Sequence, residues 1–345
     1  MNEQRLTPQL ARRLAEAAVT APSIHNTQPW RFVARPADQV IELYAEPGRM
    51  LRRTDPAGRA VHISCGAALF NLRLAVSCAA AEPVIRLLPQ PSDPQLLAVV
   101  RLAGPHQPRP RERDLCAAIW RRHTSRAPFT GPPLSMPALA ALGEAAALEG
   151  ATLFLLDEAA ADHVIRQTAA AQQRLRQDPA YVADLRAWVG GRRAADGIPE
   201  QALWPPAAAD EAGQEPFLDE PPPLLLHPAQ LTGSPQLAVL ATRTQHRADW
   251  LRAGQALQRV LLVATLHGIA ACPLNQAVDA AEPGYSRGHE LDSQYFGGQQ
   301  PQLVLRLGYG PPGPATPRRP VSAVLRVDGM AVTRTPSRLL TSGQR

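Results

Sequence analysis

Two long alanine- and leucine-rich stretches constrain the fold more than any other feature of this 345-residue chain. Residues 58–80 and residues 249–270 repeat apolar side chains at helical spacing, so each is expected to form a buried helix. Each stretch is followed by strand-like apolar segments, VIRLLP at 84–89 and PQLVLRLGYG at 301–310. This repeated order predicts two related half-domains packed around a pseudo-twofold axis.

Strand and linker patterns suggest where the two halves meet. WRFVAR at 30–35 and QVIELYAE at 39–46 alternate apolar and polar residues around the turn RPAD, which predicts a β-hairpin. GPHQPRPRER at 104–113 is rich in proline and arginine, as a linker is. We therefore predict an N-terminal half over residues 1–110 and a C-terminal half over residues 111–345.

One segment of the C-terminal half departs from the pattern of helices and strands. Residues 190–235 are rich in proline, glycine and acidic residues, yet they contain Trp204 and Phe217. A disordered linker would carry fewer large apolar side chains. We therefore expect this insert to pack over another part of the protein as a lid.

The charge pattern excludes several classes of function. The net charge is +6, and all 36 basic residues are arginine. Without lysine there is no Schiff base to pyridoxal phosphate and no P-loop lysine. Arginine, backbone N–H groups or helix N-termini must hold any bound anion. The arginines are dispersed and aromatic residues make up only 5% of the chain, so no nucleic-acid partner is expected.

The same composition predicts a soluble protein without a metal centre. No run approaches the roughly 18–20 apolar residues of a membrane span, and the N-terminal residues lack the apolar core of a signal peptide. We expect a cytoplasmic protein with no membrane partner. Cys65, Cys78, Cys116 and Cys272 form no CxxC pair, and we expect them to be reduced. No HExxH motif is present, so no metal site is expected.

The segment RRHTSR at 121–126 combines guanidinium groups, hydroxyls and an imidazole. We expect it to end a short helix over 114–126, in which Arg122 and Arg126 lie four residues apart and converge on one face. Guanidinium groups beside a hydroxyl donor suit a phosphate group. The alternative is a solvated basic helix end, which the helix dipole favours.

The stretch APSIHNTQPW at 21–30, here called the opening loop, places costly polar side chains between two prolines. Asn26 and Gln28 each offer a donor and an acceptor, which suits a ligand edge with alternating C=O and N–H groups, such as the pyrimidine edge of a flavin. Pro22 and Pro29 restrict the loop, so less entropy is lost on binding. The alternative is a structural turn in which Asn26 and Ser23 bond the local backbone.

Two shorter motifs complete the set of candidate binding elements. ACPLNQ at 271–276 opens an expected loop over 271–279 that follows a buried helix and offers backbone N–H groups to a ligand. Arg318-Arg319-Pro320 is a second candidate anion clamp, beyond the last apolar strand. Each motif by itself is weak.

Taken together, the four motifs resemble the nitroreductase superfamily, and their order resembles its Acg-like branch, in which two nitroreductase halves are fused in one chain. The similarity covers residues 10–125 and 236–325. It implies an α+β, three-layer fold, with a mixed and mostly antiparallel sheet flanked by helices. Because each motif occurs once, it also implies one FMN per chain, with the second pseudo-site degenerate.

The resemblance also assigns candidate FMN-binding residues, and none that is catalytic. The phosphate and ribityl chain would be held by the arginine motif, through Arg122, His123, Thr124 and Arg126, and the same phosphate by the C-terminal clamp, Arg318 and Arg319. The opposite half would contribute the opening loop, through Pro22, Ser23, Ile24, Asn26 and Gln28. Flavin N5 and O4 would be reached by the backbone of Asn275 and Gln276.

The implied function is that of an FMN-dependent NAD(P)H oxidoreductase that passes a hydride to flavin N5 and then reduces a nitro or quinone-like acceptor. His25 is a possible proton donor, and a structural role for it is equally expected. The alternative is a non-catalytic flavin-sequestering protein linked to stress or dormancy, which gains support if Trp204 or Phe217 covers the flavin.

A hydrolase that uses Ser23 and His25 is a third hypothesis with little support, because the chain has no GxSxG motif and no carboxylate placed to orient the histidine. A chain that already contains both halves is expected to be a monomer built as a pseudo-dimer.

Overall fold

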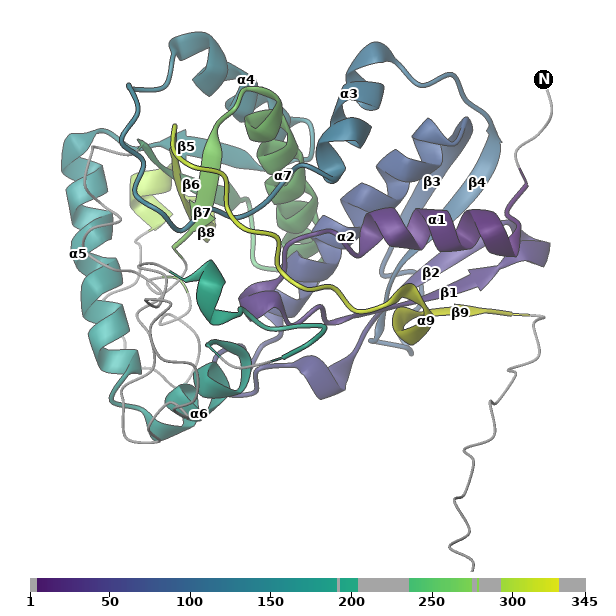
Figure 1. The fold of residues 1–345 in the computed structure, drawn as a ribbon, viewed down its shortest axis with the longest axis horizontal. Coiled ribbons are helices and arrows are strands. Elements are labelled where there is room, and N and C mark those ends of the chain that lie inside the picture. Colours follow the sequence, from purple (N-terminus) through teal and green to yellow (C-terminus); the bar gives the residue numbers. More distant parts are fainter. Residues whose placement is uncertain (1–4, 191–192, 204–235, 275–277, 279–292, 329–345) are drawn as a thin grey trace, which may run out of the picture.

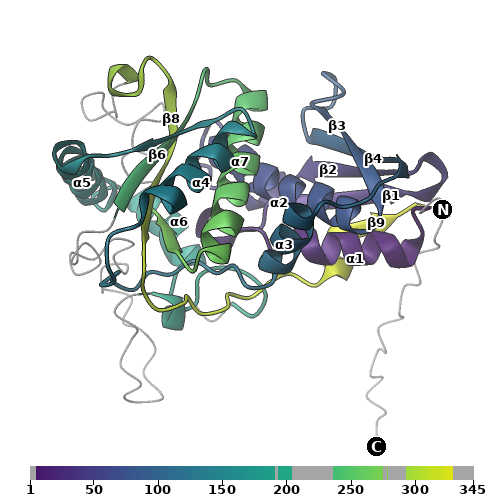
Figure 2. The ribbon, with the colours of Figure 1, turned by 90° about the horizontal axis from the view of Figure 1, so that it is seen from above.

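Two β-sheets lie side by side, with two long helices packed between them (Figure 1; Figure 2). The structure, a computed structural model, describes residues 5–190, 193–203, 236–274, 278 and 293–328. The central helices are α2 (Arg59–Cys78) and α7 (Arg247–Leu266), which confirm the helices expected over 58–80 and 249–270.

The first sheet has the strand order β3-β4-β2-β1-β9 and is covered by helices on one face. Buried side chains of β1 and β2, such as Phe32 and Leu43, pack against α1 and α2, while Arg31 and Glu42 point to the opposite, partly exposed face. The expected hairpin is confirmed. The elements are α1 (Pro8–Ala18), β1 (Trp30–Arg35), β2 (Val40–Ala45), β3 (Ala81–Leu87), β4 (Leu96–Pro105) and β9 (Leu325–Val327).

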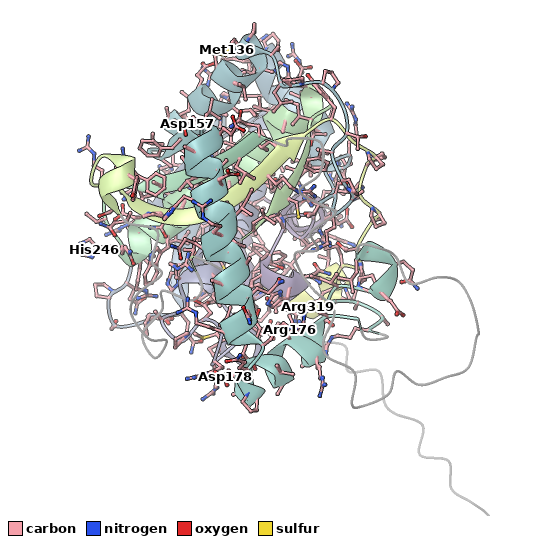
Figure 3. All side chains as sticks on the ribbon, turned by 90° about the vertical axis from the view of Figure 1, so that its left-hand side faces the viewer. Met136, Asp157, Arg176, Asp178, His246 and Arg319 are labelled. Atoms are coloured by element: carbon pink, nitrogen blue, oxygen red, sulfur yellow. The ribbon has the colours of Figure 1, made fainter. Side chains whose placement is uncertain are left out.

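The second sheet has the strand order β5-β6-β8-β7 and is covered on both faces. Ala238 and Leu240 of β6 pack toward α4 and α7, whereas Leu237 and Val239 pack toward α5, which crosses the sheet in Figure 3. Burial on both faces explains the nearly continuous apolar sequence of β8. The elements are α4 (Met136–Ala147), β5 (Thr152–Leu155), α5 (Glu158–Leu175), β6 (Gln236–Thr242), β7 (Ala270–Pro273) and β8 (Gln300–Gly308).

The two sheets share one topology. In the first, β1 and β2 pair, α2 follows, and the hairpin β3–β4 returns to pair with β2; in the second, β5 and β6 pair, α7 follows, and β7–β8 returns to pair with β6. Among the described ladders, only β1 with β9 is parallel. The expected α+β architecture with mostly antiparallel pairing is therefore confirmed, and the shared topology supports the two-half interpretation.

The central helices cross at two glycines, and the contact is reciprocal. A Cβ atom on Gly66 would lie 2.3 Å from the carbonyl oxygen of Leu251, and a Cβ atom on Gly254 would lie 2.0 Å from the carbonyl oxygen of Ile63. In each case the carbonyl belongs to the residue three positions before the facing glycine. Self-complementary contacts of this kind are typical of a twofold interface, and any larger residue would force the helices apart.

Two sequence-based expectations differ from the structure. The short helix α3 runs over Pro110–Ile119 rather than 114–126, because a proline at its first position and a Glu112 capping contact start it inside the expected linker. Residues 270–273 form strand β7, not loop, because they pair with β8. The boundary at residue 110 stays a prediction. Strand β9 belongs to the predicted C-terminal half but joins the first sheet, and the chain reaches it through α9 (Val321–Val324).

Candidate functional site

The opening loop holds a tight, left-handed backbone. His25, Asn26 and Gln28 have φ values of 43°, 55° and 50°, a conformation that costs non-glycine residues roughly 1–3 kcal/mol each. Ser23 helps to hold it, because its hydroxyl accepts a hydrogen bond from the Gln28 N–H at 2.9 Å. The hydroxyl of Ser64, in α2, accepts another from the Ile24 N–H at 3.1 Å.

This loop forms one wall of a cavity of about 120 Å³ between the two halves. The start of α2 and residues of α7, β7 and β8 form the other walls, and Tyr181 of α6 (Pro179–Trp188) covers it together with Ile198. The lining includes Pro22, Ser23, Ile24, His25, Arg59, Ile63, Ser64, Thr124, Arg126, Leu257, Pro273 and Leu303.

The arginine motif reaches this cavity as an extended segment, so the helix expected over 114–126 is wrong here. Helix α3 ends at Ile119, and residues 122–126 have no helical structure. Alternate side chains of an extended segment point in opposite directions. Thr124 and Arg126 therefore line the cavity, whereas His123 and Ser125 line a second cavity of about 300 Å³.

Arg122, on the same side as Thr124, forms a pair with Arg318 that we call the unbalanced arginine pair. Both guanidinium groups donate to the carbonyl oxygen of Thr20 at 3.1 Å. No described carboxylate forms an ion pair with either, and Nε and Nη1 of Arg122 and Nε of Arg318 have no described hydrogen-bond partner. Burial, with the charge of Arg318, lowers the pKa of Arg122 to about 9, and burial lowers that of Arg318 to about 10.

Arg126 and His25 meet at the cavity. Arg126 donates to the carbonyl oxygen of Ala202 at 3.1 Å. Burial, together with the nearby charge of Arg126, lowers the pKa of His25 to about 4. His25 is therefore a neutral imidazole at pH 7, and its buried Nε2 has no partner among the residues described.

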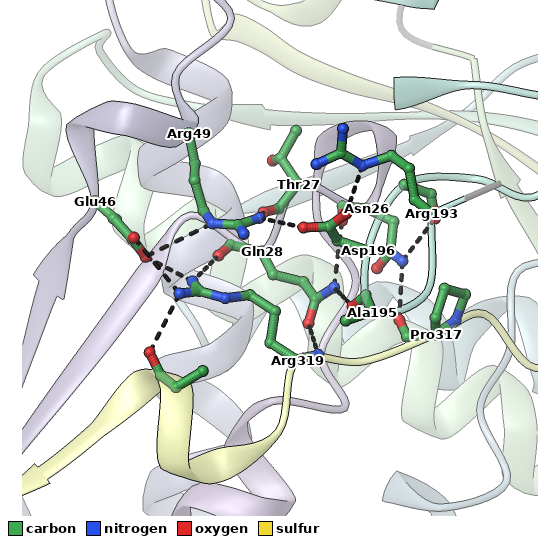
Figure 4. A network of polar contacts seen from close by, with 12 residues as sticks. Asn26, Thr27, Gln28, Glu46, Arg49, Arg193, Ala195, Asp196, Pro317 and Arg319 are labelled. Atoms are coloured by element: carbon green, nitrogen blue, oxygen red, sulfur yellow. Dashed lines mark hydrogen bonds and ion pairs between the residues drawn. The ribbon is translucent and has the colours of Figure 1, made fainter. Parts of the chain in front are cut away.

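Arg319 has contacts quite different from those of Arg318. Its guanidinium donates to Glu46 Oε2 at 2.6 Å (Figure 4). It also donates to the backbone oxygens of Gln28 and Trp30. Its own N–H donates to Gln28 Oε1 at 2.8 Å. Glu46 thus balances the charge of Arg319, and the expectation that Arg319 clamps an anion together with Arg318 stays a prediction.

The two amides of the opening loop also bond the protein rather than line the cavity. Asn26 Nδ2 donates to the carbonyl oxygens of Gly197 and Pro317, and Gln28 Nε2 donates to that of Ala195 at 3.0 Å. Asn26 Oδ1 accepts from Arg318 at 3.1 Å. The flavin-edge hypothesis for these amides stays a prediction, and both are engaged by the protein in this structure. They fasten residues 195–197, part of the predicted lid, to the loop.

Charged side chains strengthen this fastening, and together with Arg319 and Glu46 we call them the balanced ion network (Figure 4). Asp196 accepts from Arg49 at 2.8 Å and from Arg193 at 2.5 Å, and Arg49 also lies 3.8 Å from Glu46. Burial alone would raise the pKa of Asp196, but the hydrogen bonds and charges of Arg193 and Arg49 outweigh it and hold the pKa below its ordinary value.

Known proteins similar to this chain identify its family. No protein-family model matches the chain. The protein named "Putative NAD(P)H nitroreductase Rv3131" of Mycobacterium tuberculosis is 34% identical over 338 residues, spanning 94% of this chain and 93% of the relative. "Putative NAD(P)H nitroreductase acg" of the same organism is 30% identical over 339 residues, spanning 95% of this chain and 98% of the relative. The chain belongs to the nitroreductase family, in its Acg-like branch.

A solved structure of an FMN-bound nitroreductase from Desulfitobacterium hafniense is 15% identical, with a TM-score of 0.37, and covers 60% of this nitroreductase-family chain and 93% of its own. The assignment to the nitroreductase family rests on the sequence relatives, which match the chain along almost its full length.

Sequence reasoning missed part of this nitroreductase-family site. Arg59 and Ser64 line the cavity at the start of α2, and their only signal was polarity at the beginning of an apolar helix. Asn275 and Gln276, like Trp204 and Phe217, lie outside the described residues. The described residues hold no cluster of three or more His, Cys, Asp or Glu side chains that could bind a metal. Helix α2 is long and apolar enough to span a membrane, but it is a mostly buried core helix here.

Proposed function

We propose that this chain binds FMN, with the phosphate on the unbalanced arginine pair, and acts as an NAD(P)H oxidoreductase of the nitroreductase type. One observation carries the proposal: the buried guanidinium group of Arg122 and the partly buried one of Arg318 converge on the carbonyl oxygen of Thr20 without a described carboxylate. An uncompensated buried charge is costly, so such a pair is stabilised when a ligand brings the opposite charge. A phosphate dianion accepts several charge-assisted hydrogen bonds at once.

The neighbouring residues suit the rest of such a ligand. Ser23, Thr124 and Arg126 line the adjoining cavity and offer hydroxyl and guanidinium groups to a polyol chain. Ile24, Ile63 and other apolar side chains suit an aromatic ring system. We retain His123, Asn275 and Gln276 as predicted contacts, the last two through their backbone.

Bound FMN supplies an atom, N5, that takes up a hydride and passes reducing equivalents to a nitro or quinone-like acceptor. The chain's own residues bind, orient and shield this group. His25 is uncharged at neutral pH, so it offers a hydrogen bond rather than the proton of an imidazolium.

A second candidate function, flavin sequestration, is favoured by the cover over the cavity. Tyr181 and Ile198 narrow the space to about 120 Å³, whereas ligand pockets are commonly about 300 Å³ or more. Hydrogen bonds from Asn26 to Gly197 and from Arg126 to Ala202 hold the cover in place. A flavin beneath a closed cover would be shielded from NAD(P)H.

The first experiment is a visible spectrum of the purified protein, with the released chromophore identified by mass, followed by anaerobic addition of NADH or NADPH. Bound FMN that bleaches within seconds supports the oxidoreductase. Bound FMN that stays yellow in the native protein but bleaches when Asp196→Asn loosens the cover supports sequestration. A protein that contains no FMN and takes up none contradicts both.

A further inference from the structure

Two cysteines outside the candidate site face each other where α2 packs against α3. Cys78 is the last residue of α2, and Cys116 lies in the last turn of α3. Both are partly exposed, whereas Cys65 and Cys272 are buried. Among the four thiols, these two are therefore the ones that a small reagent can reach.

The hydrogen bonds of the two thiols are reciprocal. Cys78 Sγ donates to the carbonyl oxygen of Glu112 at 3.5 Å, and Cys116 Sγ donates to that of Leu74 at 3.5 Å. In an α-helix, the carbonyl of residue i−4 accepts the N–H of residue i. Glu112 stands four residues before Cys116, and Leu74 stands four residues before Cys78, so each thiol lies beside the backbone of the other cysteine.

The electrostatic environment makes the two thiols unequal. Contact with the Cys116 side chain lowers the pKa of Cys78, against the opposing effect of burial, and the charge of Arg113 adds to the lowering. The same contact, together with burial and the charge of Glu112, raises the pKa of Cys116. Because a thiolate is the nucleophile in sulfur chemistry, Cys78 is the residue that reacts first.

We propose that Cys78 and Cys116 are a redox modification site, at which hydrogen peroxide forms a reversible disulfide. The Cys78 thiolate attacks one peroxide oxygen, the O–O bond breaks, and a sulfenic acid and one water form. The sulfur of Cys116 then attacks the Cys78 sulfur, and the sulfenic oxygen leaves as a second water. Two thiols thus lose two electrons, one peroxide gains them, and a dithiol reductant reverses the reaction.

The position of the pair ties this chemistry to the arrangement of the fold. Helix α3 leads directly into the extended segment that carries Arg122, and the start of α2 lines the cavity. A disulfide between the two helices would hold that segment against the central helix. It would also lower the conformational entropy of the denatured chain, which stabilises the fold.

The test uses the full-length reduced protein, treated with hydrogen peroxide and then alkylated under denaturing conditions. We expect two of the four thiols to be lost, peptide mapping to find Cys78 joined to Cys116 within one chain, and dithiothreitol to restore both thiols. The midpoint temperature of thermal unfolding should be a few degrees higher for the oxidised form than for the reduced form.

Serine variants and their matched controls complete the test. Cys116→Ser should stop at a sulfenic acid on Cys78 that dimedone captures, and Cys78→Ser should slow oxidation of Cys116 by roughly tenfold. Cys65→Ser and Cys272→Ser should still form the bond. The proposal would be overturned if Cys78 and Cys116 can still be alkylated after the folded native protein has been treated with peroxide at concentrations that oxidise free cysteine. A cross-link to a different cysteine, or only between chains, would do the same.

Discussion

Two groups of arginines flank the opening loop, and they differ in charge balance. In the balanced ion network, Arg49, Arg193 and Arg319 meet Glu46 and Asp196 at 2.5 to 2.8 Å. In the unbalanced arginine pair, Arg122 and Arg318 share one backbone carbonyl and no described carboxylate. The contrast is sharpest at Arg318 and Arg319, neighbours in sequence that belong to different groups.

This difference separates a structural role from a binding role. Buried ion pairs that are complete hold segments together, and removing one partner is costly. Buried cations that are incomplete destabilise the protein until a ligand supplies the missing charge. The balanced network thus fastens the C-terminal segment and residues 193–197 to the first half, while the unbalanced pair is the anion site of the function proposed above.

The largest expected effect comes from Arg318→Ala. Loss of one charge-assisted contact to phosphate should raise the Kd for FMN about 100-fold. The free energy of unfolding without ligand should change little, because the loss of a charge without a described carboxylate offsets the loss of its hydrogen bonds to Thr20, Asn26 and Thr316. Fluorescence titration and urea unfolding measure the two quantities, and Arg122→Ala should behave alike.

Riboflavin, which lacks the phosphate, is the matched ligand for this prediction. Its affinity should be nearly the same in native protein and in Arg318→Ala. If riboflavin binding weakens as much as FMN binding, the pair does not hold the phosphate, and its lack of a counterion needs another explanation.

The second prediction concerns the neighbouring residue, Arg319, whose substitution should lower the stability of the protein without ligand. Arg319→Met keeps the side-chain length but leaves Glu46 only its 3.8 Å contact with Arg49, so the free energy of unfolding should fall by about 2 kcal/mol. This value is below that of a fully buried pair because a third of the Glu46 side chain is exposed. Urea unfolding without ligand measures it, with Arg12→Met on the exposed face of α1 as the control. A loss no larger than in that control would contradict a structural role for Arg319.

Asp196→Asn tests the part of the balanced network that fastens the cover, with an expected loss of about 1 kcal/mol. Hydrogen exchange should accelerate at residues 193–203 and stay unchanged in β6. The folded-state pKa of Asp196 is depressed, so its contribution is present above its unfolded pKa and is lost as pH falls through the lower folded value. Unchanged exchange at 193–203 would show that backbone bonds alone hold the cover.

The sequence predicted the elements better than it predicted the partners within the site. Apolar periodicity located α2, α7 and the first hairpin, because local spacing sets which face is buried. It missed that residues 122–126 are extended, although Arg122 and Thr124 still fall on one side, since a period of two also brings alternate residues together.

Polar partners depended on segments far apart in the chain. Asn26 and Gln28 were noted for their amides, but their acceptors, Gly197 and Ala195, come from a segment about 170 residues away. Sequence alone also could not show that Arg319 has a carboxylate partner and Arg318 has none described, because that partner, Glu46, lies 273 positions away in the sequence. Local patterns identify which residues carry polar groups, and only the fold decides which of them remain unpaired.

The last prediction, of a size similar to that for Asp196, concerns His25, beside Arg126 in the cavity. Its folded pKa of about 4 lies below the ordinary value of 6.5, so the unfolded chain binds the proton first as pH falls. Stability is therefore full above pH 6.5 and declines toward pH 4. His25→Gln should reduce the loss between pH 7.5 and 5.5 by about 1 kcal/mol, leaving the share of His62, whose pKa burial also lowers to about 4. Urea unfolding at the two pH values measures this, with the exposed His267→Gln as control. If the free energy of unfolding of His25→Gln changes with pH as in the native protein, His25 is not held neutral beside the arginines. The region around the unbalanced pair would then be more solvated than its burial indicates.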